Sequence, residues 1–442
     1  MSTLTVPPDV IGTPLADLIQ GVSDSSSNYF TTIGIEILGG IIDSSAGDDT
    51  ISGTGESSYT GIGISNSGTI NAGTGNDTIT GTGESGEIYR SRIPGLGIIN
   101  SGTMSAGTGD DSITGIGMNG GPGIFNTNRG WISGDAGNDA ITGIGGISNG
   151  GSIDGGTGDD SISGTGTGLV NAYGPGGAGV GISNTDWIGG GQGNDFIIGT
   201  GMGGRGGVYI GPGPAQGGNG TGISNSDTIS GGTGDDVITG IGKGGMDTEF
   251  VSAGGNGVGI SNSSYIRGDN GNDTLTGIGI GGRGNSAPDG RGVGIFNTGR
   301  LEAGNGEDEI LGYGTTVGIE GNGVESIGID GGNGSDYFKA RKVDGFDTQD
   351  NLIESANQDG AIANIFISGG KGNDIFDVGF GSAMLDGGKG CDTLILPTLD
   401  SGSYIIGSPN ADGLFQITNT ASLNVLSVSN IEHIFSGGVA LV

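Results

Sequence analysis

Apolar side chains recur at fixed distances from an acidic residue through most of this chain. Two residues after the acid an apolar side chain follows, and another stands seven residues before it. The acids that set this frame are Asp49, Asp77, Asp111, Asp139, Asp160, Asp195, Asp236, Asp273, Asp308, Asp336, Asp374 and Asp392. Both offsets hold in all twelve cases, although only 32% of the chain is hydrophobic. The pattern predicts a repeat protein in which the apolar residues form columns inside a stack.

A second repeated segment, GISNSGTI in its clearest form, fixes the geometry of the unit. Its asparagines are Asn66, Asn100, Asn126, Asn149, Asn184, Asn225, Asn262 and Asn297. The step to the following acid is 11 residues in seven of the eight cases (77−66, for example), and Asn128 and Arg129 are an insertion in the eighth. The step from the acid to the next asparagine varies widely. This is typical of a solenoid, whose coils are constant and whose loops leave on one side.

The shortest unit, from Asp139 to Asp160, is 21 residues long (160−139). Glycine and β-branched residues oppose helix formation, so the unit predicts two or three short parallel strands joined by tight turns. We expect an all-β protein, a right-handed parallel β-solenoid (β-roll or β-helix) of about twelve coils. Coils spaced by ~4.8 Å give a rod of roughly 60 Å. The asparagines are expected to form a ladder at a bend.

Composition restricts the function. The chain has 109 glycines among its 442 residues, few apolar residues and a net charge of -34, a composition typical of disordered proteins. The regular repeat argues instead for a folded structure. No apolar run is long enough for a transmembrane helix. One cysteine, Cys391, and one histidine, His433, provide neither a disulfide framework nor a soft-metal site. We expect incidental roles for both. Lys+Arg 14 against Asp+Glu 48 makes nucleic acid an improbable partner.

The six residues that end at each acid are rich in glycine, as in AGTGND (72–77), GGTGDD (155–160) and GGKGND (369–374). With the apolar residue two places on, they resemble the nonapeptide GGxGxDxUx of the RTX, or haemolysin-type, calcium-binding repeats, over roughly residues 46–396. The resemblance implies Ca²⁺ bound by the twelve aspartates named above and by main-chain carbonyls of successive turns. Only one turn per coil matches, so we expect one row of ions. The alternative is a calcium-free β-helix with tight Gly-Asp turns. The GISNSGTI side looks like adhesin β-helix repeats.

The chain divides into three parts. Residues 1–40 predict an N-terminal cap or degenerate repeat, 41–392 the solenoid, and 393–442 a non-repetitive C-terminal β cap, expected as an antiparallel meander. The cap resembles the end of RTX chains, which carries a type I secretion signal, and the N-terminus lacks the features of a Sec signal peptide. The charged insertion 339–360 predicts a short amphipathic helix or a long loop, or else a docking site. Glycine-rich insertions such as 201–222 are expected to be solvated loops, with sugar binding as the alternative.

These observations predict an extracellular or cell-surface protein, structural or adhesive, that folds with calcium after type I secretion. We expect no enzymatic activity, and self-assembly end to end or a cell-surface polysaccharide as partners. A polysaccharide lyase or epimerase on the same fold is the first alternative, and the scarcity of basic residues argues against it. A calcium-dependent ice-binding solenoid, which needs a flat array of outward threonines, is the second alternative. In this chain the threonines at that turn position recur too irregularly for such an array; they are Thr74, Thr108, Thr157 and Thr233.

Overall fold

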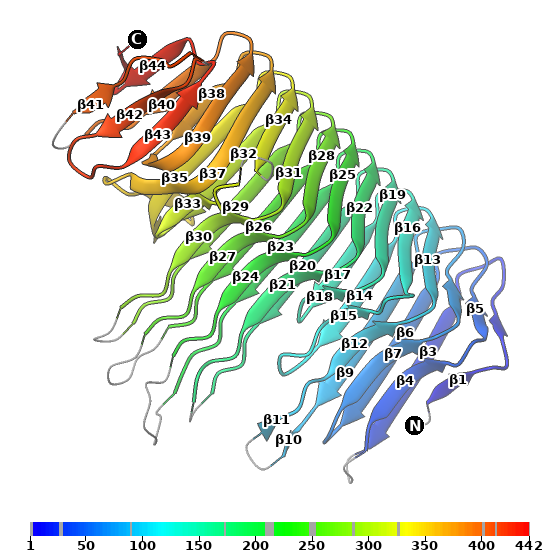
Figure 1. Ribbon diagram of the computed structural model, residues 1–442. Helices are drawn as coiled ribbons and strands as arrows, with labels where there is room; N and C mark the ends of the chain where they lie inside the picture. The colour runs from blue at the N-terminus through cyan, green and yellow to red at the C-terminus, as the bar shows by residue number, and fades with distance from the viewer. Residues whose placement is uncertain are drawn as a thin grey trace.

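The chain forms a β-solenoid whose coils each contribute three strands (Figure 1). The computed structural model describes residues 3–25, 30–88, 91–171, 174–207, 216–246, 253–284, 288–324, 328–399, 403–411 and 413–441. In a representative coil, β24 (Gly220–Asn225) and β25 (Thr228–Thr233) lie in one long sheet and β26 (Val237–Lys243) lies in a second. Each strand pairs in parallel with its equivalent in the next coil.

The same three positions recur along the rod. The first strands are β4 (Thr32–Ile37), β7 (Gly61–Asn66), β12 (Leu96–Asn100), β15 (Ile124–Asn126), β18 (Ile147–Asn149), β21 (Gly179–Asn184), β24, β27 (Gly257–Asn262), β30 (Gly292–Asn297) and β33 (Val317–Glu320). The second strands are β5 (Ile41–Asp43), β8 (Thr69–Asn71), β13 (Thr103–Thr108), β16 (Trp131–Ala136), β19 (Ser152–Thr157), β22 (Trp187–Gln192), β25, β28 (Tyr265–Asn270), β31 (Arg300–Asn305) and β34 (Ile329–Asn333). The third strands are β3 (Leu18–Ser25), β6 (Thr50–Ser57), β9 (Thr78–Ser85), β14 (Ser112–Gly117), β17 (Ala140–Ile144), β20 (Ser161–Thr167), β23 (Phe196–Met202), β26, β29 (Thr274–Ile280), β32 (Glu309–Gly314), β35 (Tyr337–Phe346), β38 (Ile375–Val378) and β40 (Thr393–Leu396). β37 (Asp359–Lys371) and β39 (Phe380–Lys389) each span the first two positions.

The interior is made of stacked isoleucine columns, as the sequence predicts. In the representative coil, Ile229 and Ile238 occupy the two expected columns and Ile223 a third, and all three are at most 1% exposed. Glycines let the first and third strands approach closely: a methyl group on Gly240 would lie 2.3 Å from the carbonyl oxygen of Gly259. This thin cross-section explains why a chain with so few apolar residues can still bury a continuous core.

The predicted asparagine ladder is present at the bend between the first and second strands. All eight asparagines are at most 2% exposed. The Nδ2 group of Asn149 donates to Oδ1 of Asn184 at 2.8 Å, and Asn184 donates in the same way to Asn225 at 2.9 Å. The same Nδ2 of Asn184 also donates to the carbonyl of Thr228 at 2.9 Å. Each bend is therefore joined to the next by an asparagine side chain, whose amide nitrogen donates to one neighbouring coil and whose amide oxygen accepts from the other.

We expect Asn184→Ala to lower the free energy of unfolding by roughly 2–4 kcal/mol, because it leaves the buried amides of Asn149 and Asn225 without one partner each. Chemical denaturation monitored by circular dichroism measures the change. Ser183→Ala, at the neighbouring position of the same strand, is the control and is expected to be near neutral. Equal effects of the two substitutions would contradict a role for the ladder.

Most of the length variation lies between third and first strands, where glycine-rich loops project side by side (Figure 1). Their arms bond to one another through the main chain. Gly204 donates to the carbonyl of Gly177 and accepts from Gly218, both at 2.8 Å. The chain of bonds continues through Gly245, Gly255, Gly282 and Gly290. A methyl group on Gly218 would lie 1.9 Å from the carbonyl oxygen of Gly177, so these arms require glycine. Residues 208–215 of the 201–222 insertion lie outside the described residues.

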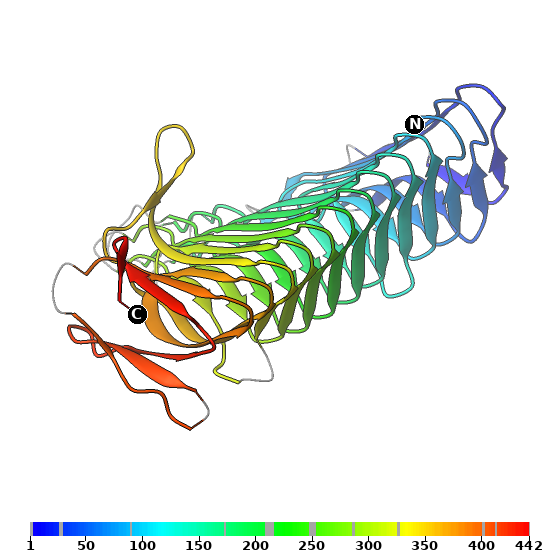
Figure 2. The same cartoon turned by 90° about the horizontal axis from the view of Figure 1, so that it is seen from above.

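The expectation of a helix or long loop at 339–360 is wrong. β35 continues to Phe346 and pairs antiparallel with β36 (Leu352–Glu354), which makes a hairpin that projects from the rod (Figure 2). Oδ1 of Asp347 accepts from the amides of Gln349 and Asn351 at 2.8 and 2.9 Å, and so closes the turn. Lys339 and Arg341 are two residues apart and both pair with Glu354. A spacing of two residues puts side chains on one face of a strand, whereas it separates them on a helix.

The two ends differ in construction. At the N-terminus, β1 (Leu4–Val6), β2 (Val10–Ile11) and β3 pair in parallel with the coil that follows. At the C-terminus, β41 (Tyr404–Ile406), β42 (Phe415–Asn419) and β43 (Val425–Ser429) form an antiparallel meander. However, β43 and β44 (His433–Ser436) also pair in parallel with β39 and β40, so the segment continues the stack by a shortened coil before β45 (Val439–Ala440). The hairpin of β10 (Glu87–Ile88) and β11 (Ser91–Arg92) completes the strands. In the described part of the chain, no helix is long and apolar enough to cross a membrane.

Candidate metal site

The twelve sequence-predicted aspartates form one continuous column at the turn between second and third strands. Each is at most 3% exposed. In every coil Oδ1 accepts a hydrogen bond from the main-chain amide of the aspartate in the preceding coil, as Asp195 does from Asp160 and Asp236 from Asp195, both at 2.8 Å. The structure therefore brings together residues that lie 18 to 41 positions apart in the sequence. One oxygen of each carboxylate is fully engaged by this ladder.

The turns that carry the ladder need two left-handed residues each. In the turn before Asp195, Gly191 has φ +118° and Gly193 has φ +123°. The second of these positions is glycine in all twelve turns, whereas the first is Ser45, Asp135 or Asp269 in three of them, at φ +76°, +76° and +78°. Asparagine and aspartate tolerate this conformation better than other residues with a side chain. The Gly-x-Gly spacing is thus a conformational requirement of the turn.

The second oxygen of the same carboxylates has no partner. Oδ2 of all twelve aspartates is buried without a hydrogen-bond donor. In several turns this oxygen faces a main-chain oxygen of the next coil. A methyl group on Gly190 would lie 2.4 Å from Oδ2 of Asp195 and 2.5 Å from the carbonyl oxygen of Gly231. Two acceptors directed at one point repel unless a proton or a cation lies between them.

The same arrangement recurs along the rod with local differences. A methyl group at the equivalent glycine would meet the carboxylate and the next carbonyl in the turns of Gly134, Gly155, Gly231, Gly268, Gly331 and Gly369. Ser44, Ala72, Ala106 and Ala303 stand at this position in four other turns, each at most 1% exposed. A side chain therefore fills the space in those four turns, and the column is not uniform.

Sequence reasoning missed two members of the ladder. The amide of Asp17 donates to Oδ1 of Asp49 at 2.6 Å, and Gly12 provides the matching glycine, whose methyl group would lie 2.6 Å from Oδ2 of Asp17. At the other end, the amide of Asp392 donates to Oε2 of Glu432 at 2.7 Å. The seven-residue and two-residue offsets contain Val10 and Ile19 around Asp17, so the apolar frame could have identified it. Glu432 lacks the glycine turn, although Val425 and Ile434 stand at the same two offsets from it.

Burial raises the pKa of the column aspartates from Asp77 to Asp392. The pKa of Asp195 is raised to about 6 and that of Asp236 to about 7 from an ordinary 3.8, chiefly by desolvation. The hydrogen bond from the preceding amide opposes the shift, and the charges of neighbouring aspartates add to it. Asp160, Asp273 and Asp336 also rise to about 7. Near neutral pH the column therefore needs protons or a counter-ion to remain buried.

The donor set suits a hard cation held partly by the main chain. In the described ranges, no group of three or more Asp, Glu, His or Cys side chains converges on one point, so an ion has to take carbonyl oxygens as well. The position that a methyl group on Gly190 would occupy is also 2.6 Å from Cβ of Asp195, and this is too close for a metal ion. Binding therefore requires the carboxylate to turn. Oxygen-only coordination of this kind favours Ca²⁺ over transition metals.

A second, exposed ladder runs beside the first. The residue before each ladder aspartate accepts from the main-chain amide of the equivalent residue one coil further on, as Asn194 does from Asp235 and Asp235 from Asn272, both at 2.7 Å. Acid and amide alternate strictly over nine coils, in the order Asp48, Asn76, Asp110, Asn138, Asp159, Asn194, Asp235, Asn272 and Glu307. Because both residue types can accept the bond, the alternation keeps the ladder while it doubles the distance between like charges.

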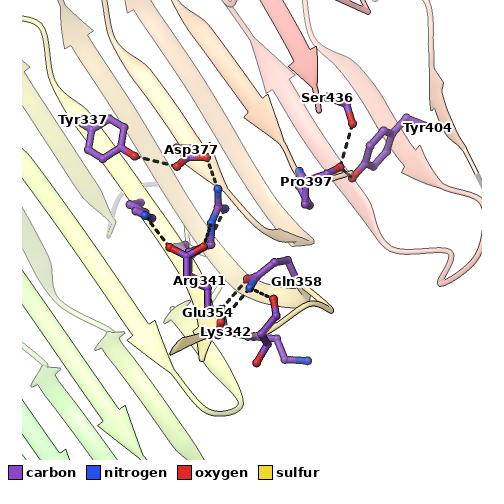
Figure 3. A network of polar contacts seen from close by, with 12 residues as sticks. Tyr337, Arg341, Lys342, Glu354, Gln358, Asp377, Pro397, Tyr404 and Ser436 are labelled. Atoms are coloured by element: carbon purple, nitrogen blue, oxygen red, sulfur yellow. Dashed lines mark hydrogen bonds and ion pairs between the residues drawn. The ribbon is translucent and has the colours of Figure 1, made fainter. Parts of the chain in front are cut away.

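A polar network beside the projecting hairpin contains the residue types that sugar-cleaving solenoids use (Figure 3). Arg341 is 8% exposed and pairs with Asp377 and with Glu354, and the hydroxyl of Tyr337 donates to Asp377 at 2.8 Å. Burial and this hydrogen bond raise the pKa of Tyr337. Lys339 pairs with Glu354 at 2.7 Å. Each charge in the network has a partner, and the contacts join β36 to the rod.

Comparison with protein-family models and with curated proteins finds no match for this chain. The stacked parallel strands define the class of this protein as a parallel β-solenoid. Its function has to be inferred from the chemistry of the aspartate column.

Proposed function

We propose that this protein is an extracellular, calcium-stabilised β-solenoid of the RTX type, with a structural or adhesive role at the cell surface. One row of Ca²⁺ ions lies along the aspartate column, bound by the carboxylates and by carbonyl oxygens of successive turns. Extracellular calcium is abundant enough to load weak sites of this kind, whereas the cytosol keeps calcium low. Export through a type I system in the unfolded state, followed by folding with calcium, fits this requirement.

The observation that carries the proposal is the unpartnered Oδ2 in every turn of the column. A buried acceptor without a donor costs about 1–3 kcal/mol, and a charged one costs more. Twelve repetitions of such a cost are compatible with a folded rod only if something neutralises them. Because a cation between adjacent turns contacts both of the oxygens that otherwise repel, it removes the cost and joins the coils in the turns whose glycine leaves this space open.

Asp195→Asn tests the site directly. The amide retains an oxygen for the bond from Asp160, and its Nδ2 group replaces the unpartnered Oδ2 by a donor on the side of the Gly231 carbonyl. We expect the variant to bind fewer Ca²⁺ ions per chain than the wild type and to be more stable without calcium. Isothermal titration calorimetry gives the stoichiometry, and denaturation in chelator gives the stability.

Asp235→Asn is the matched control, because it makes the same charge change one ladder away. Asp235 accepts from the amide of Asn272 at 2.7 Å, and asparagine already fills alternate positions of this exposed ladder. Its calcium stoichiometry should equal that of the wild type. If both substitutions reduce the stoichiometry equally, the ions bind through general surface charge and the column is not their site.

A further inference from the structure

A row of aromatic side chains runs along the outer face of the second strands, away from the aspartate column. Trp131, Trp187 and Tyr265 occupy the same position of their coils. The strand registers place Ser152 between the two tryptophans and Thr228 between Trp187 and Tyr265. An aromatic ring therefore stands on every second coil. With coils spaced by ~4.8 Å, the rings repeat at about 9.6 Å.

The rings are accessible and held in place. Trp131 is 42% and Tyr265 is 41% exposed. The indole of Trp187 lies over the backbone of its own strand, because a methyl group on Gly189 would be 2.3 Å from one of the ring carbons. The guanidinium of Arg267 lies 5.1 Å from the ring centroid of Tyr265. Among the described residues, no ring contact joins two members of the row, so mutual packing does not explain their presence.

A polar acceptor lies beside the rings. The strand register places Asp154 between Ser133 and Gly189, next to the backbone that the Trp187 ring covers. No hydrogen bond in the described part of the chain involves the Asp154 carboxylate, and burial together with Asp135 raises its pKa. A flat apolar ring with an adjacent free acceptor complements a sugar, which has an apolar C–H face and hydroxyl donors on its edge.

The row shares its period with the exposed ladder. The coils of Trp131, Trp187 and Tyr265 are those that carry the amides Asn138, Asn194 and Asn272, whereas the acids stand on the intervening coils. The outer surface of this region therefore repeats every two coils, although the interior repeats in every coil. Charge separation accounts for the doubling in the exposed ladder, but neither that ladder nor the core columns require an aromatic ring on every second coil. A ligand with a repeat of about 9.6 Å along the rod would contact one such ring at each repeat.

We propose that this aromatic row binds a neutral, extended polysaccharide chain that lies parallel to the rod axis. Extended β-linked glycans turn the same ring face to one side at every second sugar, an interval close to two coils. A net charge of -34 disfavours anionic polymers. This binding goes beyond the calcium proposal and requires only that the coils are folded.

Intrinsic fluorescence is the direct test, because the only two tryptophans of the chain, Trp131 and Trp187, both belong to the row. The calcium-loaded full chain is titrated with hydroxyethyl cellulose and with chitohexaose, and separately with carboxymethyl cellulose. We expect a saturable blue shift with at least one neutral glycan and none with the anionic one. Trp187→Ala should weaken binding at least tenfold in affinity electrophoresis. Gly189→Ala, which retains both tryptophans, should also weaken binding because its methyl group displaces the ring.

Phe196→Ala is the matched control, since Phe196 is 45% exposed on the third-strand sheet and lies outside the row. It should bind as the wild type does, and circular dichroism should show that every variant is folded. The proposal is overturned if neither neutral glycan shifts the emission, or if Phe196→Ala weakens binding as much as Trp187→Ala. Neither result bears on calcium binding, which is measured without glycan.

Discussion

Removal of calcium with EGTA at neutral pH should convert the β-sheet circular dichroism spectrum of this protein into that of a largely unfolded chain. At an effective dielectric constant near 20, two carboxylates one coil apart repel by about 3 kcal/mol. The column contains twelve such groups, each at most 3% exposed, and ordinary domains are stable by only about 5–15 kcal/mol in total. The summed repulsion and desolvation therefore exceed what the isoleucine columns can offset. Restoring calcium to millimolar levels should restore the β spectrum cooperatively.

Magnesium is the control in this experiment. Mg²⁺ requires a nearly octahedral site and loses its water reluctantly, so it should restore little structure at the same concentration. Sodium chloride at equal ionic strength controls for general screening of the net charge of -34. An unchanged β spectrum in EGTA would falsify the calcium proposal and leave a metal-free β-helix. Equal recovery with magnesium or with salt alone would show that charge screening, and not a calcium site, supports the fold.

The second large effect is on pH dependence without calcium. Desolvation raises the pKa of Asp77, Asp111 and Asp139 to about 6, and that of Asp236 and Asp273 to about 7, against about 3.9 in an unfolded chain. The folded state thus binds more protons than the unfolded state between about pH 4 and pH 7. Its stability is complete below that range and falls as the pH rises through it. We expect the metal-free protein to be folded near pH 5 and unfolded near pH 8.

One carboxyl group whose pKa rises from 3.8 to about 6 contributes roughly 3 kcal/mol over its whole titration range, and about half of this falls between pH 5 and pH 8. Saturating calcium should remove most of this pH dependence, because ions and protons neutralise the same oxygens. The calcium concentration at the folding midpoint should therefore decrease as the pH falls from 8 towards 5, since protons already stabilise the metal-free column there. Denaturation in EGTA across this range, followed by calcium titrations at each pH, measures both. A metal-free protein that is more stable at pH 8 than at pH 5 would contradict the buried, partnerless state of Oδ2.

The projecting hairpin shows where the sequence was insufficient. The charges of Lys339, Arg341 and Lys342 suggested an amphipathic helix, but they lie on the strand β35, where Lys339 and Arg341 share one face and both pair with Glu354. Arg341 is buried against Asp377 and Glu354, which are 36 and 13 positions away in the chain (377−341, 354−341). Local pattern cannot identify such partners, because the pairing of the neighbouring strands decides whether each charge is neutralised.

The sequence by itself determined the frame of the coils. A period-two pattern around each aspartate fixes which side chains point inward, because a slip by one residue would turn every isoleucine to the solvent. The asparagine ladder followed from the same frame. The sequence also placed the variable loops on one side of the unit, since only one step in the unit changes length.

The tertiary structure alone decided what the stacked columns do. It directed Oδ2 of several aspartates at a carbonyl oxygen of the next coil and added Glu432, which lacks the glycine turn, to the ladder. It also brought Trp131, Trp187 and Tyr265, which are separated by 56 and 78 residues (187−131, 265−187), into one evenly spaced row. The physical reason is the unequal length of the loops. The distance along the chain from one coil to the next varies with the loop, whereas hydrogen bonding between coils sets every residue of a column at the same interval along the rod.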